Sequence, residues 1–143
     1  MAYSTTTDLL ARVTARTLVQ LTDTGGTGGV DETIVQSAIA DSDSMINAMI
    51  APVYQVPLTT APPVIREMSA TMAVYRLHLF RSVDPGVWKD EYERALAFLR
   101  LVAQGKAKLE GVAAAPPASA SLSDSVDFSS QKRRFSRDDL KSW

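Results

Sequence analysis

Four of the chain's seven glycines lie in the stretch QLTDTGGTGGVDE, residues 20–32, and clusters of this kind can bind phosphate. A phosphate-binding P-loop needs a Lys-Ser/Thr pair directly after its last glycine, but Val30 and Asp31 stand there. A dinucleotide-binding pattern that starts at Gly26 would place its third glycine at Asp31, whose carboxylate would repel a pyrophosphate. The stretch therefore indicates a flexible hinge between two helices, without a ligand.

The same stretch contains the triplet Asp23-Thr24-Gly25, which matches half of an aspartic protease site. A homodimer could complete such a site by placing two carboxylates around one water molecule. That arrangement needs a β-rich scaffold, whereas the sequence on both sides of the triplet has helical periodicity. A homodimeric aspartic hydrolase that uses Asp23 stays a distant alternative.

Metal sites are not favoured by the remaining titratable residues. The run DSDS at residues 41–44 begins like a calcium loop, but Met45 and Ile46 occupy positions where a ligand and a glycine belong. It is more typical of a solvated helix face. His78 is the only histidine and the chain has no cysteine, so a common zinc site cannot form, and we expect a histidine at a helix surface or interface. We predict no catalytic residue, no metal and no cofactor.

Length and charge narrow the class of protein further. The chain has 143 residues, 45% of them hydrophobic, and a formal net charge of −1, which fits one domain without a strongly basic face for nucleic acid. The start MAYSTTTDLL lacks the basic and apolar regions of a signal peptide, and we expect no membrane association. The mixed charges between residues 76 and 100 are typical of helix surfaces and could bridge subunits in a ring.

Apolar residues recur at steps of three and four, which predicts an all-α fold, a small bundle of four to five helices in residues 1–111. One helix or two short ones follow a capping threonine at the N-terminus, and the next helix begins behind Asp31 and stops before Pro52. Two more helices begin near Pro63 and Trp88. The residues predicted for the core are Ile39, Ile46, Met68, Met72, Tyr75, Trp88, Tyr92, Leu96 and Leu99.

A proline-containing segment, residues 52–63, separates two of these helices and predicts a protruding loop. We expect this loop to contact a partner through its larger side chains, which are Val53, Tyr54, Gln55, Val56 and Leu58.

The composition changes after Gly111. Residues 112–127 contain mainly Ala, Pro and Ser, which predicts a flexible linker, and 16 such residues span roughly 20–24 Å. Residues 128–143 form a basic tail with aromatic residues, typical of a docking segment whose candidate contact residues are Arg133, Arg134, Phe135, Arg137, Leu140 and Trp143. A small nucleic-acid-binding module that uses KRRFSR is the alternative.

Short stretches along the chain together resemble the small Mu-like phage proteins encoded in head morphogenesis modules. They include TDLLAR at the start, AIADSD at residues 38–43, YQVPL at residues 54–58, YERALAFL at residues 92–99 and FSRD at residues 135–138. The resemblance implies a head-tail connector, or adaptor, in which small helical bundles form a ring under the portal.

The resemblance implies a ring of twelve copies that binds the phage portal protein and the next neck or tail-completion protein, in the neck of a virion assembled in the host cytoplasm. From the residues of the tail itself we expect that it docks on the portal. The alternatives are a disordered end, or basic residues that contact DNA in the channel.

Overall fold

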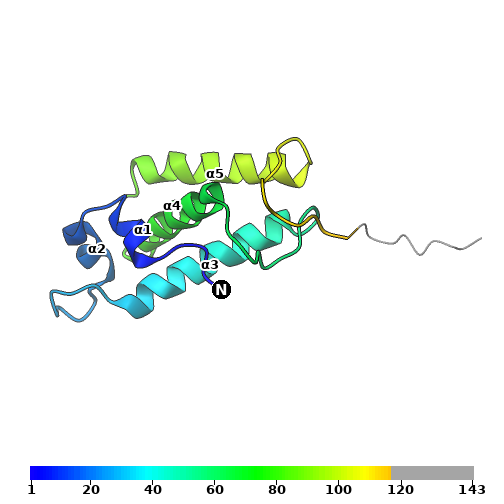
Figure 1. Ribbon diagram of the computed structural model, residues 1–143. Helices are drawn as coiled ribbons and strands as arrows, with labels where there is room; N and C mark the ends of the chain where they lie inside the picture. The colour runs from blue at the N-terminus through cyan, green and yellow to red at the C-terminus, as the bar shows by residue number, and fades with distance from the viewer. Residues whose placement is uncertain (117–143) are drawn as a thin grey trace, which may run out of the picture.

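The computed structural model describes residues 1–116, and within them the chain forms five helices. They are α1 (Thr6–Leu10), α2 (Ala15–Thr22), α3 (Glu32–Ile50), α4 (Pro63–Phe80) and α5 (Val87–Ala103). Helix α4 lies between α3 and α5, and the short helices α1 and α2 cover one end of the bundle (Figure 1). In the part described, one isolated antiparallel bridge is the only β pairing. The predicted all-α bundle is confirmed.

The helix starts follow from local hydrogen bonding. Thr5 accepts a hydrogen bond from the Asp8 N–H while Asp8 reaches back to the Thr5 N–H, so α1 begins with a capping box. The Asp31 carboxylate accepts from the amides of Thr33 and Ile34, as predicted for the start of α3. Pro63 is the first residue of α4, where its missing N–H leaves no partner unsatisfied.

Two apolar clusters lie one after the other along the bundle. The first, near the loops that follow α3 and α5, is built around Ile46, Ile65, Met72 and Leu99. The second joins α1 and α2 to the first half of α3 and the last half of α4. Of the predicted core residues, Ile39, Ile46, Met72 and Leu99 are buried, and Met68, Tyr75, Trp88, Tyr92 and Leu96 are partly buried. The rings of Tyr75 and Tyr92 stack with their centroids 4.4 Å apart.

Helix α4 is buried over a wider surface than its three-four pattern predicts. Ser69, Thr71 and His78 are buried together with the apolar residues, because α1, α2, α3 and α5 all contact this helix. Leu79, which continues the predicted apolar stripe, is 53% exposed because it lies at the end of α4 beyond its neighbours.

Candidate functional site

Two tyrosine hydroxyls hold the loops at one end of the bundle. This is the end at which the described residues stop, at residue 116. The Tyr3 hydroxyl accepts the Leu58 N–H at 2.8 Å and donates to Asn47 Oδ1. The Tyr54 hydroxyl accepts the Leu109 N–H at 2.8 Å. Both tyrosines are buried, so each bond satisfies an amide that would otherwise lack a partner away from water. The loops after α3 and α5 are thereby joined to the core at this loop end, which we define as residues 51–62 and 104–116.

A short antiparallel pairing extends this arrangement. The Gln55 N–H donates to the Ala113 carbonyl at 3.2 Å, and the Ala115 N–H donates to the Val53 carbonyl at 2.8 Å. The chain therefore stays on the body through Ala115, beyond the boundary predicted at Gly111. Residues 51–62 carry no charged side chain, whereas Lys106, Lys108 and Glu110 lie in the second segment of the loop end.

The predicted contact loop differs from the expectation that it protrudes. Tyr54 and Leu58 are buried in the first apolar cluster and Val53 packs partly against it, while Gln55 and Val56 are exposed. The prolines do interrupt the helix, but the apolar side chains between them pack against the core, since none of the helices described within residues 1–116 covers this end of the bundle. Of the five side chains predicted to contact a partner, only those of Gln55 and Val56 are exposed.

The DSDS run forms part of a buried polar network, so the prediction of a solvated face is wrong for Ser42 and Asp43. Asp43 accepts the Tyr3 N–H at 2.8 Å and the Ser69 hydroxyl at 2.5 Å, and Ser4 Oγ lies 2.7 Å from Ser69 Oγ. Burial raises the pKa of the Asp43 carboxyl, and the two donors oppose that shift. The network joins the N-terminal segment to α3 and α4, a structural use of a carboxylate.

The glycine loop is organised by its own aspartate. Asp23 accepts the backbone N–H groups of Gly28 at 2.7 Å and Thr27 at 2.9 Å, and these bonds lower the pKa of its carboxyl. The Asp31 N–H donates to Thr22 Oγ1 at 3.2 Å, which ties the base of the loop. Two amides of the loop are thus used internally and are not free to bind a phosphate. A carboxylate held ionised by donors also differs from the proton-sharing pair of an aspartic hydrolase.

We expected His78 at a helix surface or an interface, and it is buried within the body. Its Nδ1 lies 2.9 Å from the carbonyl oxygen of Val74, one turn earlier in α4. Among residues 1–116 no group of three or more His, Cys, Asp or Glu could hold a metal ion. None of the helices in the same range is long and apolar enough to cross a membrane.

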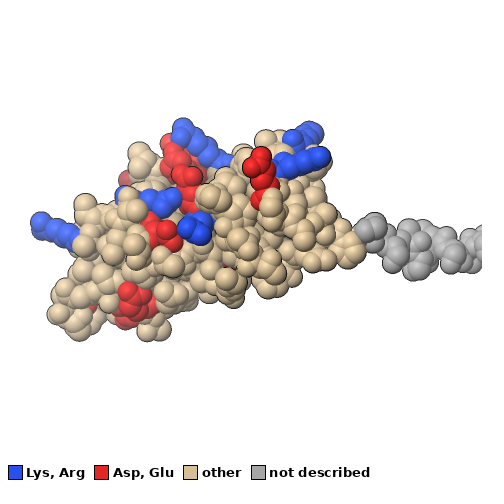
Figure 2. All heavy atoms as spheres, viewed as in Figure 1, with Lys and Arg blue, Asp and Glu red and all other residues tan. Residues whose placement is uncertain are grey.

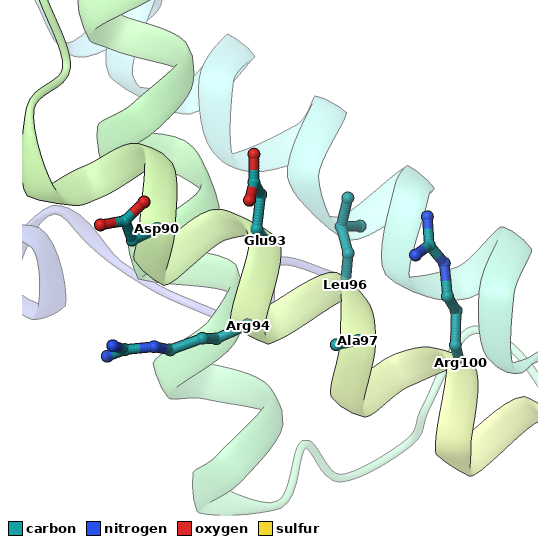
Figure 3. Close-up of a pocket in the computed structure, with 6 residues that line it drawn as sticks. All are labelled: Asp90, Glu93, Arg94, Leu96, Ala97 and Arg100. Carbon is teal, nitrogen blue, oxygen red and sulfur yellow. The ribbon is translucent and has the colours of Figure 1, made fainter.

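The outer face of α5 carries the most charge on the visible surface, with both signs interspersed (Figure 2). A hollow of about 670 Å³ runs along it, lined by six residues of this one helix, Asp90, Glu93, Arg94, Leu96, Ala97 and Arg100. Figure 3 shows Glu93, Leu96 and Arg100 projecting to one side and Asp90 and Arg94 to the other. All six lining residues belong to α5, so the hollow lies along one helix surface, a position that suits polar contact with another molecule.

Sequence reasoning missed the tyrosine and aspartate bonds that hold the loop end. Tyr3 precedes the first helix and its partners lie 40 to 55 residues away, so no local pattern marks it. The predicted docking residues Arg133, Arg134, Phe135, Arg137, Leu140 and Trp143 lie outside the described residues.

Taken together, the described residues form a helical scaffold with a firmly bonded loop end and a charged outer helix. The family model described as "Bacteriophage Mu, Gp36" matches residues 3–128. One relative, "Mu-like prophage FluMu protein gp36" of Haemophilus influenzae, is 30% identical over 107 residues, which cover 75% of this chain and 74% of the relative. The chain belongs to the Bacteriophage Mu Gp36 family and is a bacteriophage protein.

Proposed function

We propose that this protein is a structural head-tail connector of a tailed bacteriophage. Copies of the helical body form an oligomeric ring that binds the portal protein and joins the DNA-filled head to the next neck or tail-completion protein. The protein then resides in the neck of the virion after assembly in the host cytoplasm. Membership of a phage family supports a role within a bacteriophage, and the described body supports a role in assembly rather than in catalysis.

The observation that carries the proposal is the fixed loop end. The hydroxyl of Tyr54 and the pairing of Val53 with Ala115 hold the chain on the body up to the point where residues 117–143 begin. A docking segment that starts from a fixed point searches a smaller volume for its partner than one that starts from a loose strand. The basic and aromatic residues predicted for portal docking follow within this segment, with Phe135 and Trp143 as apolar anchors.

A pull-down with portal-bearing heads tests the proposal. The full chain should be retained on the heads, and negative-stain images should show added density under the portal. A chain that ends after residue 127 should keep its helical content, because the described helices end at Ala103, and should lose retention.

A matched variant separates docking by apolar anchors from attraction between charges. Phe135→Ala with Trp143→Ala keeps every basic residue of the tail, and we expect it to reduce retention about as strongly as the truncation does. Retention of the truncated chain at the level of the full chain would contradict portal docking by the tail. Retention on free DNA that disappears at raised salt, without binding to heads, would instead favour the nucleic-acid-binding alternative.

A further inference from the structure

A patch of exposed apolar side chains lies at the turn between α4 and α5. Leu79, Phe80, Val83 and Val87 are 53%, 57%, 49% and 71% exposed, and we call them the turn patch. They are four of the nine exposed large hydrophobic residues in the described part, all within nine positions. Large exposed apolar patches mark interaction sites, so these residues, close together in the chain, are a candidate contact surface.

The turn that carries the patch has a defined geometry. The Val83 N–H donates to the His78 carbonyl at 2.9 Å, and the Gly86 N–H donates to Asp84 Oδ1 at 3.0 Å. Ser82 has a φ of 54°, the left-handed conformation that reverses the chain at the end of α4. The patch is therefore presented by a bonded turn, which lowers the entropy lost when a partner covers it.

An apolar groove lies at the loop end. It has a volume of about 710 Å³ and is lined mainly by apolar atoms of residues 60–64, Phe98 and residues 108–111. The bond from the Leu109 N–H to the Tyr54 hydroxyl fixes one wall, and Pro62 and Pro63 stiffen the other. The groove is thus formed before any partner arrives.

The patch and the groove lie at opposite ends of the molecule. Helix α4 begins at Pro63, beside the groove, and ends at Phe80, within the patch. Its 18 residues correspond to about 27 Å along the helix axis. Two different surfaces at opposite ends suit a head-to-tail contact between copies, and repetition of such a contact gives a ring when the rotation closes.

Each of the two surfaces has one basic and one acidic side chain beside it. Arg81 and Asp84 lie in the turn that carries the patch, and Lys108 and Glu110 line the groove. A patch seated in a groove can therefore set Arg81 near Glu110 and Asp84 near Lys108, with opposite charges facing each other.

We propose that the turn patch of one copy docks in the loop-end groove of the next copy, with Phe80 as the main apolar anchor. The occupant of the groove is a second copy of this chain. This inference rests on the proposed connector function and names the contact that would join the subunits of its ring.

Two blocking variants test the direction of the contact in sedimentation velocity experiments with the full chain, alone and on portal-bearing heads. Phe80→Arg blocks the patch and Thr60→Arg blocks the groove, and both positions are exposed, so the body should stay folded. Val87→Arg is a second patch variant, and Leu10→Ala, at a residue exposed on α1, is the control. Each blocking variant should lose self-association by roughly 30-fold or more, and the control should not.

Mixing the two blocked chains gives the sharpest outcome. A mixture of Phe80→Arg and Thr60→Arg chains retains one intact patch and one intact groove, so it should form one-to-one dimers and nothing larger. Thr60→Arg chains that associate as the wild type does would overturn the inference, since the patch would then bind something other than the groove. A wild-type chain that stays monomeric both alone and on the heads would overturn it as well.

The other outcomes separate this contact from the proposed function. Ring formation unaffected by Phe80→Arg and Val87→Arg would overturn the patch contact and leave the connector function standing. The tail truncation is measured separately, and its loss of retention on portal-bearing heads tests only the proposed connector function. Association that depends on residues 128–143 and ignores Phe80→Arg would assign the groove to the C-terminal segment instead.

Discussion

Truncation of Leu99 measures how much the first apolar cluster contributes to stability. Its side chain is fully buried on α5 among Ile46, Ile65 and Met72. Leu99→Ala removes three carbons, worth about 2.4 kcal/mol at about 0.8 kcal/mol per buried carbon. The cavity left between three helices adds to this loss, and we expect about 3 to 5 kcal/mol in total.

The assay is urea unfolding followed by far-ultraviolet circular dichroism, which reports the helices of the body. For a domain of this size the expected loss lowers the melting temperature by roughly 12 to 20 °C. Leu101→Ala is the matched control, because it makes the same change on the same helix at a residue that is 43% exposed. The control should lose less than about 0.5 kcal/mol. Equal losses for the two variants, or a loss below about 0.5 kcal/mol for Leu99→Ala, would refute the assignment of Leu99 to the core.

Three further substitutions test the loop end, the polar network and the glycine loop. Tyr54→Phe leaves the buried Leu109 N–H without its acceptor, so the free energy of unfolding should fall by about 1 to 3 kcal/mol. Hydrogen exchange at the Leu109 amide should accelerate, and unchanged exchange would contradict the bond. Because the folded state raises the pKa of Asp43, that carboxyl favours folding most below its ordinary pKa of about 3.9, and the benefit declines as the pH rises through the raised value. The unfolding free energy of the wild type minus that of Asp43→Asn should therefore be larger at low pH than at neutral pH, and a flat difference would count against the shift. Gly26 has a φ of +69°, so Gly26→Ala should destabilise the protein by about 1 kcal/mol. Gly25 does not have a positive φ, so Gly25→Ala should be nearly neutral. Equal melting temperatures of the two variants would contradict the strained turn.

Much of the fold could be predicted from the sequence, because helix starts and stops depend on neighbours in the chain. The cap at Asp31, the end of α3 before Pro52 and the start of α4 at Pro63 each involve residues within one helical turn. The three-four spacing likewise identified Met72 and Leu99 as inward-facing residues, since side chains at those steps share one face of a helix.

Fewer features of the candidate site could be predicted from the sequence. The spacing of apolar residues says which face of a helix turns inward but not how many neighbours surround it, so the burial of His78, expected at a helix surface or interface, was not predicted. The proline-containing loop was recognised, yet its packing through Tyr54 and Leu58 depends on the absence of a helix over that end of the bundle.

The sequence by itself determined the helices, their order and the resemblance to Mu-like phage proteins, because each of these depends on short-range patterns along the chain. Only the tertiary structure decided the bonds of Tyr3 and Asp43, the seating of residues 113–115 on the loop after α3, and the separation of the turn patch from the groove. Those contacts join segments that are distant in the chain, and a hydrogen bond or an apolar contact forms wherever folding brings complementary groups together, whatever their separation in sequence.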